Sequence, residues 1–211
     1  IQKVTVADRP YGGVLDDLKD TAYRVIADHI RTLTFALTDG ATIGNVGRDY
    51  VLKRILRRAE RYGYQVLGTN EPFLYKLVDT VVDNFGAAFP ELRRNPHKVK
   101  DQIRDEEAAF LRTLRRGIVL FDRIAQRLKA DGLTVVSGDD AFKLHDTYGV
   151  LIDITQQMAQ EQGLTVDMTG YEQAMTRAQE QARGGGKKFV VSAVKGDLPA
   201  TDDAPKFGAE P

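Results

Sequence analysis

The sequence predicts an all-α fold: a helical bundle with one long helix packed antiparallel to a neighbour, followed by a mostly irregular C-terminal tail. Apolar residues recur three or four positions apart through most of the 211 residues, as the buried side of an amphipathic helix requires. Glycine and proline fall between these segments, where helices end. We find no internal repeat and no alternation of strand and helix patterns.

Each element follows from this spacing. It predicts helices over 16–37, 48–67, 72–85, 97–129, 140–149, 153–162 and 170–183. The helix over 97–129 is the longest, and its apolar residues alternate three and four apart, so a partner helix should lie along it. The glycines at 184–186 then break the pattern, and 189–194 has the pattern of one short strand.

These elements divide the chain into three parts. Residues 1–15 form an extended connection, 16–183 the helical domain, and 184–211 a linker. The chain opens with Ile1 and closes on a turn-rich stretch, so we expect a piece of a longer protein. The alternative is a mature chain after processing.

Composition excludes several classes of protein. Thirty basic residues balance thirty acidic ones, so the chain is not basic throughout, although one basic face remains compatible with this balance. No cysteine is present and only three histidines are, so disulfides, thiolate metal sites and a histidine-rich metal site are not expected. No apolar run approaches the roughly 20 residues of a membrane span. The absence of cysteine fits a reducing compartment, and we expect a cytoplasmic protein.

The second predicted helix carries the strongest chemical signal. Its apolar and basic residues occupy opposite arcs, each about 140° wide. Arginine predominates, and its planar group suits phosphate oxygens, which favours a nucleic acid. The alternative is that the cations pair with acids of neighbouring helices. A membrane surface is disfavoured because the apolar arc holds no Trp or Phe. We call these cations the basic row: Arg48, Lys53, Arg54, Arg57, Arg58 and Arg61.

Other candidates are weaker. Four arginines of the long helix could extend a basic surface or be ordinary solvated residues: Arg112, Arg115, Arg116 and Arg123. His29 falls on the apolar side of the first helix, as a core residue would. Neither catalytic nor metal-ligating residues emerge, because no nucleophile, paired-carboxylate, phosphate-loop or zinc motif occurs.

Four ordered segments together resemble the alanyl-tRNA synthetase family. They are AYRVIADHIR at 22–31, NVGRDYVLKRILRRA at 45–59, EEAAFLRTLRRG at 106–117, and LHDTYG at 144–149 with DIT at 153–155. The later stretch TDDAPKF resembles the sequence just ahead of that family's editing domain. The resemblance implies the helical tRNA-recognition domain that lies between the class II catalytic domain and the editing domain, both absent here.

The resemblance also implies an activity for the parent enzyme. That enzyme joins alanine to tRNA in two ATP-dependent steps, with magnesium and a zinc ion expected in the full-length protein and no cofactor in this piece. The piece alone would be inactive, and its partner would be the acceptor stem of alanine tRNA. The alternative from a different class is a helical protein-interaction bundle whose arginine row binds an acidic partner.

In this family an Asn before the basic helix and an Asp in a YDTYG motif read a G·U wobble pair of the acceptor stem. The matching positions here are Asn45 and Asp146. Asn offers a donor and an acceptor, whereas ionised Asp only accepts. The basic row would hold phosphates without reading sequence. On local grounds, Asn45 could instead be a left-handed loop residue, and Asp146 could make a hydrogen bond at a helix end or between helices.

The sequence departs from the family pattern in three places. Asp49 stands where glycine is usual, and could cap the helix or weaken a phosphate contact. Val150, Leu151 and Ile152 replace the usual Phe-Pro-Val, and His145 replaces Tyr. None of these changes removes an assigned residue.

Overall fold

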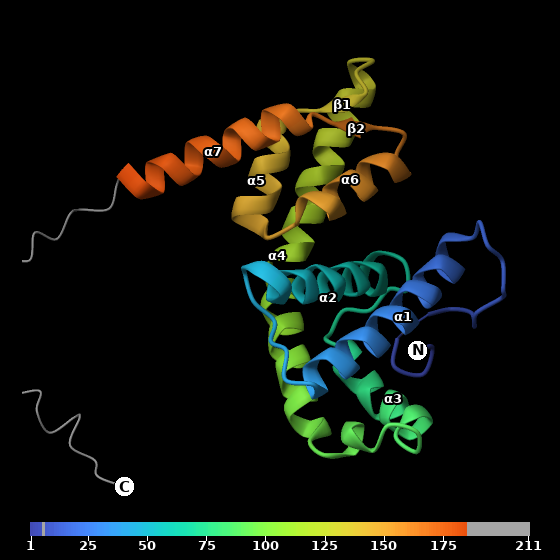
Figure 1. Ribbon diagram of the computed structural model, residues 1–211. Coiled ribbons are helices and arrows are strands. Elements are labelled where there is room, and N and C mark those ends of the chain that lie inside the picture. The colour runs from blue at the N-terminus through green and yellow to red at the C-terminus, as the bar shows by residue number, and fades with distance from the viewer. Residues whose placement is uncertain (6, 185–211) are drawn as a thin grey trace, which may run out of the picture. The chain divides into compact units, whose positions relative to one another are not determined.

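The computed structural model describes residues 1–5 and 7–184, and helices dominate this part of the chain (Figure 1). The all-α class expected from the sequence is confirmed. The helices of the described residues are α1 (Leu18–Thr38), α2 (Gly47–Gln65), η1 (Leu74–Leu77), α3 (Val78–Phe85), η2 (Pro90–Arg93), α4 (Pro96–Ala130), α5 (Gly138–Tyr148), α6 (Ile152–Glu161) and α7 (Met168–Gly184).

Side-chain caps and glycines set the helix boundaries. The carboxylate of Asp17 accepts from the third amide beyond it and starts α1. Ser137 starts α5 in the same way, and Gly149 ends it with a φ of 65°. The helix expected over 72–85 is instead the 3-10 helix η1 followed by α3. The reason is that Glu107 accepts three backbone amides at the start of η1 and fixes that turn.

The helix α4 is 35 residues long and belongs to two hydrophobic cores. Its first part, with Val99 and Ile103, packs with α1, α2, η1 and α3. Its second part, from Phe110 to Leu128, packs with α5 and α6. Figure 1 shows α5 returning antiparallel along this second part, as the sequence predicts. One unbroken helix therefore contributes to both cores.

Two very short strands were not predicted. β1 (Val135–Val136) and β2 (Thr165–Val166) pair in parallel, with Val135 opposite Thr165 and Val136 opposite Val166. A strand of two residues is too short to give a period-2 pattern, so the sequence offers no signal for it. The strand expected over 189–194 lies outside the described residues.

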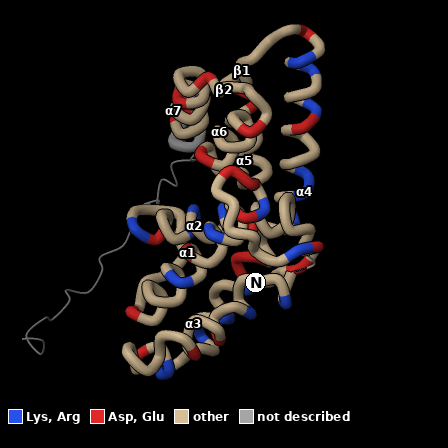
Figure 2. The backbone as a smooth tube through the Cα atoms, turned by 90° about the vertical axis from the view of Figure 1, so that its right-hand side faces the viewer, with Lys and Arg blue, Asp and Glu red and all other residues tan. Residues whose placement is uncertain are grey.

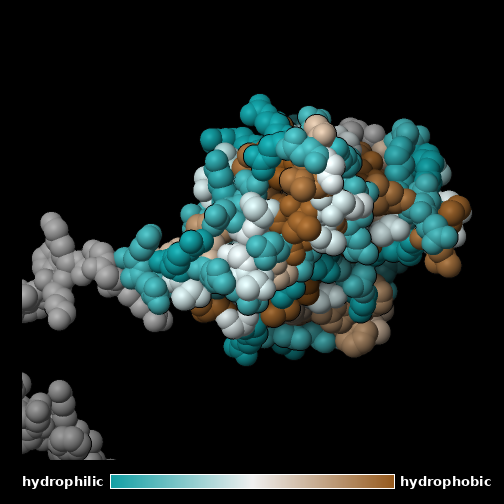
Figure 3. Space-filling view, turned by 90° about the horizontal axis from the view of Figure 1, so that it is seen from above, coloured by the Kyte–Doolittle hydropathy of each residue, from teal (hydrophilic) through white to brown (hydrophobic). Residues whose placement is uncertain are grey.

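Contacts divide the chain into Ile1–Ala174 and Met175–Pro211. Of the second unit the structure describes the end of α7, and every site discussed below lies in the first. Seen from above, hydrophobic side chains reach the surface in patches bordered by hydrophilic ones (Figure 3). Among the described helices, none is both long and apolar enough to cross a membrane.

Candidate nucleic-acid interface

The basic row lies on α2, whose apolar side packs in the first core through Leu52, Leu56 and Ala59. The opposite side of α2 faces α4 and α6, because its cations form ion pairs with acids of these two helices. The row therefore lies along the junction of three helices, rather than on an isolated solvent-facing surface.

Glu106 of α4 binds two members of the row. Arg57 donates to its Oε1 atom through Nε at 2.9 Å and Nη2 at 2.7 Å. The Nζ atom of Lys53 lies 3.5 Å from the same oxygen. These side chains are only 12% to 15% exposed, so salt screens this cluster less than it would a surface pair. We call Lys53, Arg57 and Glu106 the Glu106 network.

Two acids of α6 bind the other cations. The Oδ2 atom of Asp153 accepts from Nη2 of Arg58 at 2.6 Å and lies 3.5 Å from Nε of Arg54. Glu161 pairs with Arg61, whose side chain is 1% exposed. Asp153 stands in the first turn of α6, where the helix dipole favours a negative charge. Pairing with acids of neighbouring helices, the alternative weighed for the basic row, is what these three arginines do here.

Pairing does not cancel the charge of the row. Its five members from Lys53 to Arg61 share three carboxylates, which leaves two positive charges in excess. Exposure then separates the members. Arg48 is 91% exposed, and Arg54 and Arg58 are 43% and 37% exposed. These three can meet an external phosphate directly, whereas Arg57 and Arg61 lie inside the helix junction.

Asn45 lies exposed in the loop between α1 and α2. Its Oδ1 atom accepts a hydrogen bond of 2.9 Å from Nζ of Lys53. Lysine can only donate, so the amide oxygen must face it and the Nδ2 group remains available as a donor. Every positive φ in the described residues belongs to a glycine, including Gly47 at 57°. Asn45 is therefore not the left-handed residue of this loop.

Asp146 is exposed in the last turn of α5. Within the described residues it makes no hydrogen bond or ion pair, so neither a helix-end nor an inter-helix bond accounts for it. A negative charge at this end of a helix opposes the helix dipole and costs about 0.3–1 kcal/mol. Both carboxylate oxygens are thus free to accept, at a helix end where the dipole disfavours a negative charge.

A continuous set of contacts connects the two candidate readers. Lys53 of the Glu106 network holds Asn45, and Arg57 of the same network donates from Nη1 to the carbonyl oxygen of Gly149 at 2.8 Å. Gly149 lies three residues after Asp146 and ends α5. Figure 1 shows the start of α2 next to this end of α5. Residues about 100 positions apart in the sequence are thereby held at one junction.

The departures from the family pattern are accommodated locally. Asp49 accepts from the hydroxyl of Thr42 at 2.6 Å, and the cap of α2 at Val46 has no side-chain bond, so Asp49 braces the loop without capping the helix. Val150 and Leu151 are buried in the second core. These residues therefore stabilise the surroundings of the junction.

Burial sets the charge state of the two more buried histidines. His29 is 14% exposed, with Nδ1 3.4 Å from Asp28, and burial lowers its pKa. His145 contacts the hydroxyl of Tyr171, and burial lowers the pKa of this ring also. Both therefore favour the neutral form at pH 7. The placement of His29 on the buried side of α1 agrees with the sequence pattern.

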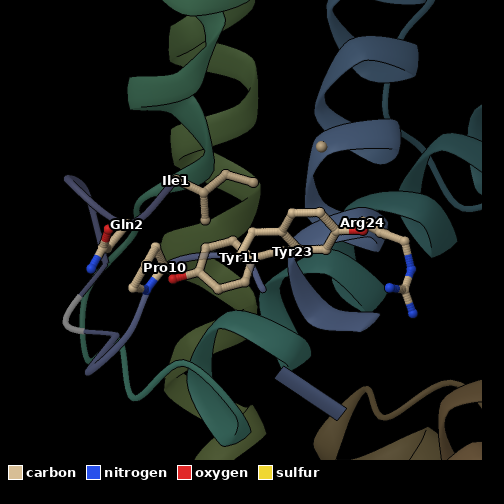
Figure 4. A pocket seen from close by; sticks show the side chains of 7 residues that line it. Ile1, Gln2, Pro10, Tyr11, Tyr23 and Arg24 are labelled. Carbon is tan, nitrogen blue, oxygen red and sulfur yellow. The ribbon is translucent and has the colours of Figure 1, made fainter. Parts of the chain in front are cut away.

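A pocket near the N-terminus lies apart from this interface (Figure 4). Its charged lining residue, Arg24, donates to the carbonyl oxygens of Val14 and Leu15. The lining offers no acid or histidine for proton transfer. It comprises Ile1, Gln2, Pro10, Tyr11, Tyr23, Arg24 and Ala27.

Comparison with known proteins establishes the class. The family described as tRNA synthetases class II (A) matches residues 1–208, and the chain belongs to this family. Its relatives include the alanine–tRNA ligase of Chlorobium phaeobacteroides, 52% identical over 173 residues that cover 82% of this chain and 19% of the relative. The cytoplasmic alanine–tRNA ligase of Caenorhabditis elegans is 45% identical over 213 residues, which cover 94% of this chain and 22% of the relative. The chain thus spans about a fifth of the length of these relatives.

Proposed function

We propose that this chain is the tRNA-recognition part of an alanine–tRNA ligase. It binds the acceptor stem of alanine tRNA and reads the G·U wobble pair, while other parts of the protein join alanine to the tRNA. The observation that carries this proposal is Asp146, an acid that has no partner among the described residues, at a helix end that Arg57 ties to the network holding Asn45. The alanine–tRNA ligase relatives support the same substrate.

The two readers offer opposite hydrogen-bonding groups. Lys53 occupies the oxygen of Asn45, so Asn45 presents its amide donor to an acceptor on a base. Asp146 presents only acceptors and must face a donor such as an amino group. A wobble pair shifts its bases and exposes groups that a Watson–Crick pair covers. A protein surface with both a donor and an acceptor can therefore distinguish a wobble pair from a Watson–Crick pair. Near the end of an acceptor stem the base edges are easier to reach than within an A-form helix.

The basic row divides its work according to exposure. Arg48, Arg54 and Arg58 contact phosphates and set the register of the stem without reading its sequence. Lys53, Arg57 and Arg61 act from within the helix junction, where they position the readers and contribute to the excess positive charge. A bundle that recruits an acidic protein partner is less well supported, because acids of this chain already occupy most of the row.

The chemistry of alanine transfer belongs to other parts of the parent protein. We assign ATP, magnesium and zinc to those parts. Among the described residues, no group of three His, Cys, Asp or Glu side chains is placed to hold a metal ion. We derive no step through these groups, and we expect the 211-residue chain alone neither to activate alanine nor to charge tRNA. A cytoplasmic location completes the proposal.

The test is a comparison of two tRNAs in the full-length parent. Asn45→Ala and Asp146→Ala should each lower kcat/KM for charging tRNA with the G·U pair by about five- to 150-fold, the equivalent of about 1–3 kcal/mol for one base contact. Alanine activation should change far less. The gap between G·U tRNA and a tRNA with G·C in its place should narrow, because the discriminating contact is gone.

Matched controls lie on α3. Asn84→Ala and Asp83→Ala remove the same chemical groups from exposed positions outside this interface, and should leave the gap unchanged. If Asn45→Ala and Asp146→Ala weaken both tRNAs equally with the gap intact, these residues position the stem or support the fold, and the assignment of readers is wrong.

A further inference from the structure

The middle of α4 carries arginines that no acid of the described residues neutralises. We call Arg112, Arg115, Arg116 and Arg123 the α4 arginines; all four are exposed. Ion pairs of the described residues engage five cations of α2 with acids of α4 and α6, yet none engages an α4 arginine. Figure 2 shows the basic positions recurring along this stretch of α4. Within the described part of the chain, the α4 arginines thus add four unpaired positive charges to the two in excess on α2.

These arginines form an ordered surface. At about 100° per residue, Arg112, Arg116 and Arg123 fall within an arc of about 40°, and Arg115 lies beside it. A rise of about 1.5 Å per residue spreads them over about 16 Å of the helix. The acid of this stretch is Asp122, which is half-buried and accepts from Gln162 at 3.3 Å. Four positive charges therefore face one partly covered negative charge.

Aromatic rings orient two of the four guanidinium groups. Arg116 lies over the ring of Tyr148, with its Cζ atom 5.7 Å from the ring centre. Arg115 lies over Tyr64 at 5.5 Å and donates from Nη2 to the carbonyl oxygen of Asn70 at 2.6 Å. These contacts hold the charges in place without neutralising them. Side chains ordered in this way lose less entropy when they bind a ligand.

The surface adjoins the candidate reader on α5. Tyr148, beneath Arg116, comes two residues after Asp146. A side-chain carbon added at Gly117 would lie 2.6 Å from Val150 and 3.2 Å from Tyr148, so α4 and the end of α5 approach closely here. A polyanion bound at Asp146 would therefore pass close to the α4 arginines.

We infer that the α4 arginines bind the phosphate backbone of the tRNA whose acceptor stem is read at Asn45 and Asp146. This inference rests on the proposed function and extends the interface onto α4. Like charges on one helix face repel each other, and phosphates relieve that repulsion. The surface contacts the backbone alone, so it adds affinity and salt dependence for every tRNA and contributes no preference for the G·U pair.

The experiment measures binding of the 211-residue chain to alanine tRNA at 50 and 200 mM salt. Two lost phosphate contacts lower the slope of log affinity against log salt by about 1.8. Raising salt from 50 to 200 mM lowers the affinity of each protein by some factor. That factor should be about twelve times smaller for Arg112→Gln/Arg116→Gln than for the unsubstituted chain. Arg112→Lys/Arg116→Lys keeps the charge and should keep most of the slope. The matched control, Arg93→Gln/Arg94→Gln, removes two exposed charges just before α4 and should leave the slope unchanged.

The outcomes separate this inference from the proposed function. An unchanged slope in Arg112→Gln/Arg116→Gln, with Asn45→Ala still erasing a preference for the G·U pair, overturns the inference and leaves the proposed function in place. A reduced slope in a chain that does not distinguish G·U from G·C supports the inference while refuting the reading of the pair. The inference is overturned if the Arg93→Gln/Arg94→Gln control reduces the salt slope as much as Arg112→Gln/Arg116→Gln does. It is also overturned if the unsubstituted chain does not bind the tRNA at 50 mM salt.

Discussion

Arg57 donates a hydrogen bond of 2.8 Å to the carbonyl oxygen of Gly149, 92 residues later in the chain. Gly149 adopts a φ of 65°, which a glycine accepts without strain. A side-chain carbon there would also lie 2.8 Å from Nη1 of the same arginine. The last residue of the α5 cap is thus packed directly against α2, and the position of Asp146 depends on that contact.

Removal of Arg57 should unfold the junction. Loss of one partner from a buried ion pair costs about 3–5 kcal/mol, and because these side chains keep 12% and 15% exposure we expect about 2–3 kcal/mol for Arg57→Ala. Urea unfolding at pH 7 measures this cost. Arg104→Ala is the control, because Arg104 pairs with Asp101 on the surface, where a pair contributes about 0–1 kcal/mol. Equal costs for the two variants would contradict a structural role for Arg57.

Loss of Lys53 should blur the reading of the wobble pair. Without its bond to Oδ1, the amide of Asn45 is no longer held with its donor outward. Lys53→Met should therefore narrow the gap in kcat/KM between G·U and G·C tRNA, by no more than Asn45→Ala does. The double variant Asn45→Ala/Lys53→Met should show no further narrowing, because both changes remove the same contact. Additive narrowing would mean that Lys53 contacts the RNA independently.

Stability should depend on pH through two buried carboxyl groups. Burial raises the pKa of Glu60 well above its usual value, and the neighbouring Glu107 raises it further. Burial likewise raises the pKa of Glu107 to about 7, although three backbone amides favour its charged form. A carboxyl with a raised folded pKa binds more protons when folded, so stability falls as pH rises from the unfolded pKa of about 4.3 through the folded value.

Glu60→Gln isolates the first of these groups. Glu60 has no hydrogen-bond partner in the part of the chain that the structure describes, so the neutral amide should fit in its place and raise stability at pH 8. The advantage should shrink as the pH falls to 5, where the native side chain is itself neutral. Urea unfolding at the two pH values measures the difference, and exposed Glu71→Gln should leave the pH dependence unchanged. If the unfolding free energy changes equally between pH 5 and pH 8 in Glu60→Gln and in the unsubstituted chain, Glu60 does not take up a proton on folding.

Gly63 should not tolerate a methyl group. A carbon added there would lie 2.2 Å from the ring of Phe73, which is 1% exposed. Overpacking of this kind costs about 1–3 kcal/mol, which exceeds the roughly 1 kcal/mol that alanine gains over glycine in a helix. Gly63→Ala should therefore lower stability in thermal or urea unfolding. Phe73→Leu combined with Gly63→Ala should cost less than the sum of the single changes, and strict additivity would count against the clash.

Helix positions were predictable from the sequence, whereas the partners of the cations were not. Periodicity placed Arg57 and Arg61 on the polar side of α2, because that depends on local spacing alone. Their acids, Glu106 and Glu161, lie 49 and 100 residues away, and no local pattern says which helix will face α2. The basic row therefore looked more available for nucleic acid in the sequence than its exposure in the fold allows.

The candidate readers show the opposite case. The family resemblance singled out Asn45 and Asp146, which carry no strong local signal. The fold then excludes a left-handed Asn45 and leaves Asp146 without a partner among the described residues. The link from Lys53 to Asn45 could not be predicted, because it depends on how the loop before α2 folds back onto the helix.

The continuity of α4 helps to fix the separation between Asn45 and Asp146. Asn45 is carried by helices of the first core and Asp146 by helices of the second, and the same unbroken helix runs through both cores. A bend in α4 or a break of the Arg57 contacts would change the separation of the two readers. The binding surface is therefore preorganised for a rigid duplex. Little of the binding free energy is lost to ordering the protein.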